Sequence, residues 1–292
     1  MNPVHRCLTL SAGIFLLAGA RAQEWRADAS YTWANNLSRT SYAADRLNAA
    51  VYAGSVTAQW HRQLTGDWAA VWAAEAGLEQ VPTFTGLDRV HAGARFDLHR
   101  KFGLGPFAPV LSFNAGATRH ELHEHGRSHW KTEAGVNLSQ RLTETWRVSA
   151  GGSWEEDYAR DKPFNIVNRR ATVETTWDLT DRIQLSAGAS RLWGELTANA
   201  NQDIWWQALA GGFGPAVGKY YNTVPYEQSS AFGDDWIAYR IDCRADLWWL
   251  DATIALGEHT SLPLRYESVK VVNRANVAYR SEFWSLSLVH RF

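Results

Sequence analysis

Charged side chains of both signs recur at every second position in several segments, and they are the residues best placed to do chemistry. The positions between them are mostly apolar, so the charged side chains of a segment share one face. They are Arg26, Asp28, Glu75, Glu79, Arg89, Arg95, Asp97, Lys131, Glu133, Arg147, Glu155, Arg170, Glu174 and Asp178. Such faces can bind polar or charged solutes, or their charges can pair with one another and only stabilise the fold. The predicted solute-binding residues are Glu75, Glu79, Arg89, Arg95, Asp97, Lys131, Glu133, Arg147, Arg170, Glu174 and Asp178.

A histidine-rich stretch at residues 120–129 is the densest group of potential metal ligands. Imidazole nitrogen and carboxylate oxygen suit zinc or copper, and the candidates here are His120, His123, His125 and His129. Their spacing matches no closed-site pattern, and H-E-x-x-H is absent. We therefore expect a solvated polar loop without a metal.

Motifs for covalent or metal-assisted hydrolysis are also missing. The sequence has neither G-x-S-x-G nor an H-x-S-x-N stretch, and Ser128-His129 alone is too weak a signal. We expect no catalytic residue, no enzymatic activity and no cofactor, and a lipid-modifying enzyme is the least favoured hypothesis.

The elements that carry the charged faces have the two-residue period of β-strands. From Trp68 to Leu78, for example, tryptophan, alanine and leucine alternate with residues that include Glu75. We predict an all-β chain of about twelve strands, most of them long enough to cross a bilayer when tilted. No apolar run is long enough for a transmembrane helix, so crossing a membrane would require a closed barrel. A soluble β-sandwich is the rival interpretation, because its strands alternate too.

The C-terminal strand carries a more specific signal. Trp284, Leu286, Leu288, His290 and Phe292 alternate with smaller or polar residues, and the chain ends on the aromatic ring. This strand resembles the closing strand of bacterial outer-membrane β-barrel proteins, although His290 stands where that class often has an aromatic residue. The resemblance implies an antiparallel up-and-down barrel whose last strand pairs with the first. It also implies that Trp284, Leu286, Leu288 and Phe292 form the signal read by the barrel-assembly machinery.

The connections between the predicted strands alternate in length. Short turns include Thr65-Gly66-Asp67 and Thr180-Asp181, whereas the other connections are longer and polar. This asymmetry is typical of periplasmic turns and extracellular loops. The longest connection, near residues 198–235, is rich in aromatic residues and glycine, and we expect it to constrict, plug or cap the barrel. At Trp248-Trp249 the apolar phase switches, which indicates a bulge or a strand that rises above the lipid.

Composition and the N-terminus complete the prediction. The chain has 292 residues, a net charge of -1 and 16 tryptophans, which favours a membrane interface and argues against nucleic acid as a partner. Residues 1–22 read as a signal peptide cleaved before Gln23, which would leave Cys243 as the one cysteine and no internal disulfide. We thus expect a signal peptide at 1–22 and, at 23–292, a barrel in the outer membrane of a Gram-negative bacterium.

Three functions remain open at this stage. The first is a porin-like channel that passes small polar solutes through a charged lumen. The second is a structural or surface-interaction barrel with an occluded lumen, and the third is the lipid-modifying enzyme. The expected partners are outer-membrane lipid, the assembly machinery during insertion and a small polar solute.

Overall fold

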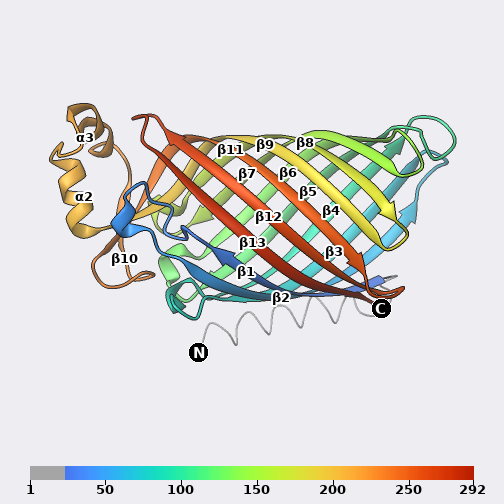
Figure 1. The fold of residues 1–292 in the computed structure, drawn as a ribbon, viewed down its shortest axis with the longest axis horizontal. Helices are drawn as coiled ribbons and strands as arrows, with labels where there is room; N and C mark the ends of the chain where they lie inside the picture. Colours follow the sequence, from blue (N-terminus) through green and yellow to red (C-terminus); the bar gives the residue numbers. More distant parts are fainter. Residues whose placement is uncertain (1–23) are drawn as a thin grey trace.

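The strands of the protein close into one antiparallel barrel (Figure 1), in a computed structural model that describes residues 24–292. Within this part of the chain the wall contains twelve strands, which confirms the predicted fold. They are β1 (Glu24–Ala34), β2 (Ala49–Gln63), β3 (Trp68–Gln80), β4 (Arg89–Lys101), β5 (Val110–Leu122), β6 (His129–Arg141), β7 (Trp146–Ala159), β8 (Ile166–Thr180), β9 (Ile183–Asn201), β11 (Trp236–Ala255), β12 (Thr260–Asn273) and β13 (Ala278–Arg291). The predicted signal peptide lies outside the described residues.

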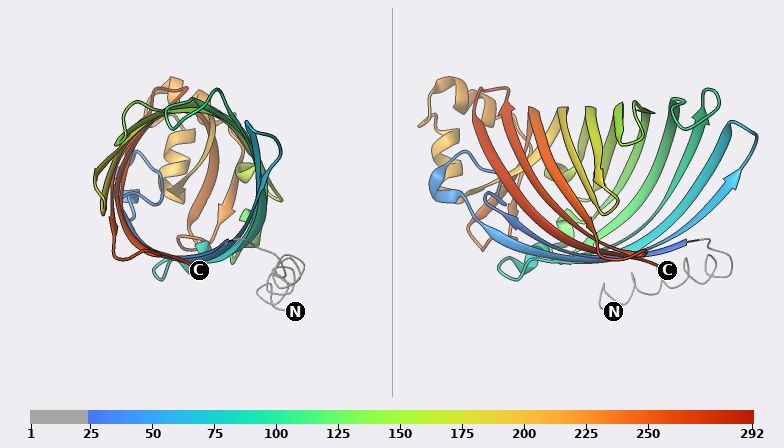
Figure 2. Two further views of the ribbon diagram at one scale, coloured as in Figure 1. Left: turned by 90° about the vertical axis from the view of Figure 1, so that its right-hand side faces the viewer. Right: turned by 45° about the vertical axis from the view of Figure 1, so that its right-hand side comes forward.

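Two pairings close the wall into the ring seen in Figure 2. The last strand pairs with the first, with Trp33 opposite Trp284, as the resemblance implied. A short strand, β10 (Tyr226–Ser229), leaves the wall and pairs only with the start of β11, so β9 bonds directly to β11. Closure leaves no unpaired strand edge along the wall, which is the condition for a sheet to lie in lipid.

The two-residue period places apolar side chains outside and charged side chains inside. On β3, Trp72 and Leu78 are exposed on the outer face, and Trp72 packs against Phe96 of β4 with ring centroids 5.5 Å apart. Glu75 and Glu79 point the opposite way, because successive side chains of a strand alternate between faces. An apolar outer face and a polar interior are the reverse of a soluble β-sandwich, so that interpretation is wrong.

The two ends of the barrel differ, and we call them the short-turn end and the long-loop end. At the short-turn end lie the turns at residues 64–67, 102–109, 142–145, 181–182 and 256–259, together with Glu24 and Phe292. The long-loop end carries residues 35–48, 81–88, 123–128, 160–165, 202–235 and 274–277. Residues 202–235 contain α2 (Gln202–Leu209), α3 (Pro215–Tyr221) and β10, which stand together at one end in Figure 1. Among residues 24–292, no helix has the length and apolar character to span a membrane.

The phase switch on β11 is not a bulge. Pairing with β9 runs without a register shift from Trp236 to Ile254. Trp248 is exposed on the outer face, whereas Trp249 is buried inside. Further toward the long-loop end the outer face becomes charged, and Asp246 pairs there with Arg191 of β9. The upper half of β11 therefore rises above the apolar band, which was the other predicted explanation.

Candidate functional site

The charged faces predicted from the sequence line the interior, and most of their side chains are paired. Ion pairs or hydrogen bonds join Arg26 to Asp28 (2.8 Å), Glu75 to His91 (3.0 Å), Glu79 to Arg89 (2.8 Å), Arg95 to Asp97 (2.8 Å), Lys131 to Glu155 (2.8 Å) and Asp178 to Arg141 (3.8 Å). Four of the predicted residues make no ion pair with any other residue in 24–292, namely Glu133, Arg147, Arg170 and Glu174. Contact of these residues with solute stays a prediction.

The first long loop, residues 35–48, crosses the lumen, and we call it the strap. It starts at β1 and bonds to β9, which is four strands away around the wall through β13, β12 and β11. Ser38 O accepts hydrogen bonds from Asn199 N (3.0 Å) and Asn199 Nδ2 (3.1 Å), and the Asp45 carboxylate accepts one from Asn201 N (2.9 Å). Burial raises the pKa of Asp45, and the hydrogen bond from Asn201 opposes that shift. The strap is thus bonded to β9 at two points, through Ser38 and through Asp45.

A buried arginine joins the strap's anchor to three other loops. Arg127 Nη2 donates to Asn199 Oδ1 (2.7 Å) and to Ser229 Oγ (2.8 Å), and Arg127 Nε donates to Glu124. Its guanidinium also lies 4.6 Å from the centroid of the Phe164 ring. Burial lowers the pKa of Arg127, while the adjacent Glu124 carboxylate favours the charged form. Loops 123–128, 160–165 and 202–235 therefore meet at one cation beside the strap.

The long loop stands at the long-loop end of the barrel and packs part of its aromatic surface against the start of β11. Trp205 of α2 is buried, with its ring centroid 4.8 Å from that of Tyr239 on β11 and 5.7 Å from that of Tyr221 on α3. Asn273 of β12 donates to the Tyr221 hydroxyl (3.2 Å). In the view along the barrel from the short-turn end, these segments overlap the opening of the ring (Figure 2). We call Arg127 and its partners Glu124, Asn199 and Ser229 the Arg127 node. The strap, the Arg127 node and the long loop together form what we call the cap.

Beneath the cap the lumen contains a partly open chamber of about 450 Å³. Its lining combines charged, polar and apolar side chains, among them residues of the strap, of loop 123–128 and of strands β3 to β9. The charged members are Arg39, Glu79, Arg89, Arg127, Lys131, Glu155, Asp157 and Arg170. Of the residues predicted to bind solute, the structure brings Glu79, Arg89, Lys131 and Arg170 together here. The others lie elsewhere along the strands.

The candidate metal ligands are split between two places. His120 and His129 line the chamber side by side, with ring centroids 4.7 Å apart, and His91 lies 5.6 Å from His120. His123 and His125 border a separate surface depression. Within residues 24–292, no group of three or more His, Cys, Asp or Glu residues is placed to hold a metal ion. The expectation of a solvated loop is wrong for part of this stretch, because His120 is at the end of β5 and Arg127 is buried under the cap.

Sequence reasoning missed the residues that build the cap. Asn36, Ser38 and Asn199 are each less than 5% exposed, yet a polar residue gives no sign that it will be buried by a distant segment. Arg39 is exposed, and it was missed because the sequence does not show that the strap lies against the chamber. The available signal was local, because Asn-x-Ser-x-Thr is the kind of short polar run whose side chains hold turns.

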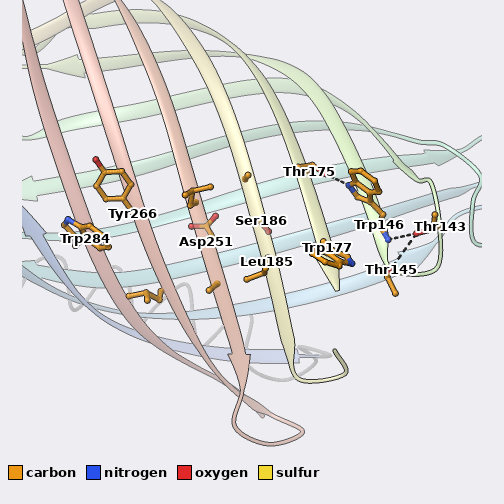
Figure 3. A pocket seen from close by; sticks show the side chains of 14 residues that line it. Thr143, Thr145, Trp146, Thr175, Trp177, Leu185, Ser186, Asp251, Tyr266 and Trp284 are labelled. Carbon is orange, nitrogen blue, oxygen red and sulfur yellow. Dashed lines mark hydrogen bonds between the residues drawn. The ribbon is translucent and has the colours of Figure 1, made fainter. Parts of the chain in front are cut away.

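A shallow groove of about 920 Å³ lies on the outer face, away from the lumen. Figure 3 shows the aromatic side chains that border it, including Trp146, Trp177, Tyr266 and Trp284. Leu250 and Leu264 add exposed apolar surface. Its apolar lining and its place on the wall suit acyl chains, so the groove belongs to the lipid-facing surface and not to the candidate site.

Comparison with known proteins places the fold. No protein-family model matches the chain, and a search of curated proteins gave no match. Among solved structures, an outer-membrane channel from Pseudomonas putida F1 aligns with a TM-score of 0.58 at 12% identity, covering 93% of this chain and 96% of that one. The fold is that of an outer-membrane β-barrel.

Two porin structures align more loosely. They are the NanC porin (TM-score 0.46, 8% identity, 90% of this chain and 98% of that one) and the KdgM porin (TM-score 0.45, 5% identity, 91% and 99%). At these identities the comparisons describe architecture, and the function has to be argued from the lumen and the cap.

Proposed function

We propose that this protein is an outer-membrane channel for small polar or charged solutes. The observation that carries the proposal is the chamber of about 450 Å³, which has charged walls and lies between the cap and the ion-paired lumen. A lumen that served only to stabilise the wall would be filled by its own side chains, as the interiors of small barrels are. The similarity to a Pseudomonas putida outer-membrane channel supports the proposal at the level of architecture.

The proposal also assigns a direction and a route of assembly. The long-loop end faces the exterior and the short-turn end faces the periplasm, as expected for such barrels. A cleaved signal peptide at 1–22 exports the chain, and Trp284, Leu286, Leu288 and Phe292 present the assembly signal to the barrel-assembly machinery. Outer-membrane lipid contacts the apolar wall, with the groove bordered by Trp177 and Trp284 as part of that surface.

Conductance in a planar lipid bilayer tests the proposal. Discrete current steps from the refolded chain beginning at Gln23 would support a channel. A variant in which an Asn-Gly turn replaces residues 202–235 is well suited as a comparison, because Asn201 and Trp236 are already register partners across the barrel wall. This variant removes α2, α3 and β10 and should carry a larger unitary current, because the cap loses its largest part.

The second candidate function is an occluded structural barrel. It is favoured by the extent of ion pairing inside and by the buried Arg127 node that holds the cap shut. A folded, heat-modifiable barrel that stays silent in the bilayer, with and without residues 202–235, would establish this alternative over the channel.

A further inference from the structure

We infer that the chamber is a binding site for small organic anions with an apolar body, and that Arg39 is the residue that determines this selectivity. The inference rests on the proposed channel, because it names the class of solute that the channel passes.

Arg39 belongs to the strap and lines the chamber. Its backbone has a φ of 56°, a left-handed conformation that is uncommon for arginine. The side chain of Asn36 holds this turn, because Asn36 Oδ1 accepts from Thr40 N (3.2 Å) and Asn36 Nδ2 donates to Thr40 O (2.9 Å). A turn fixed in this way points one residue out of the loop, and that residue is exposed.

The charge of Arg39 acts on opposite walls of the barrel. It is within electrostatic range of Asp157 on β7 and of Tyr279 on β13. β7 and β13 are five strands apart in one direction around the wall and seven in the other. Because Arg39 also lines the chamber, its guanidinium is available to a solute that binds there.

The chamber contains more positive than negative charge. Five cations and three carboxylates line it when histidine is neutral. Arg89 is paired with Glu79, Lys131 with Glu155, and Arg127 with Glu124, which lies just outside the lining. The cations left without an ion pair within residues 24–292 are Arg39 and Arg170, against Asp157 as the remaining acid.

Two guanidinium groups without an ion-pair partner can receive a carboxylate. Arginine presents planar donors that match carboxylate geometry, and a charge-assisted bond in a partly dry chamber is stronger than one in water. The shared negative ligand would also offset the repulsion between Arg39 and Arg170. The site thus favours a monoanion over a neutral or cationic solute of the same shape.

The rest of the lining favours an apolar body on that anion. Leu37, Leu192, Leu196, Phe164 and Phe232 supply apolar surface to the same chamber. A solute that buries a ring against them gains hydrophobic stabilisation that acetate or chloride cannot obtain. The chamber therefore recognises an anionic end and an apolar end together.

A second cavity, which is lined in part by the strap, offers further apolar surface to a solute of this kind. It holds about 200 Å³ and is lined by Thr40, Tyr42, Trp205, Phe213 and Tyr221, together with their apolar neighbours. Tyr42 and Phe213 meet there in a tilted arrangement, with ring centroids 5.7 Å apart. Because Thr40 of this cavity follows Arg39 directly in the strap, aromatic surface lies close to the residue that carries the guanidinium.

Benzoate is the probe that combines both features, and benzamide is its neutral isostere. Isothermal titration calorimetry on the detergent-solubilised barrel should show benzoate binding at least about tenfold tighter than benzamide binding, and Arg39→Gln should abolish that preference. In a bilayer with a salt gradient, the reversal potential of the wild type should show a preference for anions. Added benzoate should reduce the current through the wild type. Arg39→Gln should weaken both effects. Arg46→Gln is the matched control, since it removes the same charge from an exposed position of the same strap.

The two proposals fail in different ways. Current steps with equal binding of benzoate to the wild type and to Arg39→Gln would overturn the anion site and leave the channel standing. A silent barrel that binds benzoate in an Arg39-dependent way would overturn the channel and uphold the site. Equal effects of Arg39→Gln and Arg46→Gln would also overturn the inference, because they would show a general effect of loop charge.

Discussion

Replacing Arg127 by methionine should open the cap without unfolding the barrel. Methionine keeps the length and apolar contacts of the side chain, but it removes the hydrogen bonds to Asn199 and Ser229 and leaves the largely buried Glu124 carboxylate without its cation. Breaking a buried ion pair by removing one partner costs about 3 kcal/mol or more. That cost corresponds to roughly a hundredfold shift in the equilibrium between closed and open caps.

The barrel wall should be unaffected, because its backbone hydrogen bonds do not involve these side chains. Hydrogen exchange distinguishes local opening of the cap from unfolding of the barrel wall, because it reports the opening of each amide separately. In Arg127→Met, the Asn199 amide that donates to Ser38 should exchange roughly a hundredfold faster, while amides in the middle of β5 stay protected. The unitary current should rise in the same variant.

Two controls make this test selective. Arg244→Met removes an outward-facing arginine with a 3.8 Å contact to Asp246, and should change cap exchange by less than about 1 kcal/mol. The double variant Arg127→Met/Glu124→Leu removes both buried charges and should recover much of the closed cap. If Arg127→Met exchanged and conducted like the wild type, the assignment of Arg127 as the centre of the cap would be refuted.

Further expected outcomes concern packing, acid response and assembly. Gly188→Ala places a Cβ 2.1 Å from the Trp249 ring and should destabilise the barrel by about 1–3 kcal/mol in urea unfolding, whereas Gly66→Ala, with open space around its Cβ, should change little. Because burial raises the pKa of Asp45, the carboxylate opposes cap closure above that pKa and the penalty disappears as the pH falls below the unfolded value of about 3.9. Asp45→Asn should therefore slow exchange of cap amides at pH 7 relative to wild type, with the difference vanishing near pH 3 once intrinsic rates are corrected. Equal exchange at both pH values would contradict the assigned burial effect. Phe292→Ala should lower the yield of inserted barrel in cells more than Arg291→Gln does, while both refold alike in detergent; equal yields would remove Phe292 from the assembly signal.

The barrel itself was accessible from the sequence because its determinants are local. A two-residue period fixes which side chains share a face, so the separation of Trp72 and Leu78 from Glu75 and Glu79 follows from the pattern. That the apolar face is the outer one followed from the barrel prediction. Closure by the last strand was implied by the resemblance of the strand around Trp284 to the closing strand of outer-membrane barrels. The two explanations offered for the phase switch at Trp248-Trp249 were separated only by the continuous register between β9 and β11.

The cap was inaccessible for a physical reason. Ser38 and Asn199 are 161 positions apart and meet only because the barrel brings the strap to the far wall. Such contacts leave no periodic trace in the sequence. The boundary of the longest loop moved for a related reason, since β9 continues to Asn201 through pairing with β11, and the loop occupies 202–235. The sequence predicted which charged residues face the lumen. Which of them form ion pairs could be seen only in the structure, because most of these pairs join different strands.

Chemical modification of a single cysteine during a bilayer recording tests the central claim most directly. The variant Arg39→Cys in a Cys243→Ser background carries one thiol, at the tip of the strap, in the chain beginning at Gln23. A sulfonate-bearing thiol reagent added to the long-loop side should reduce the unitary current in single, irreversible steps, and the same reagent on Arg46→Cys should leave the current unchanged. Current that persists unaltered after Arg39→Cys has been fully modified, or a folded barrel that never conducts, would contradict a channel that passes solutes through the chamber beneath the strap.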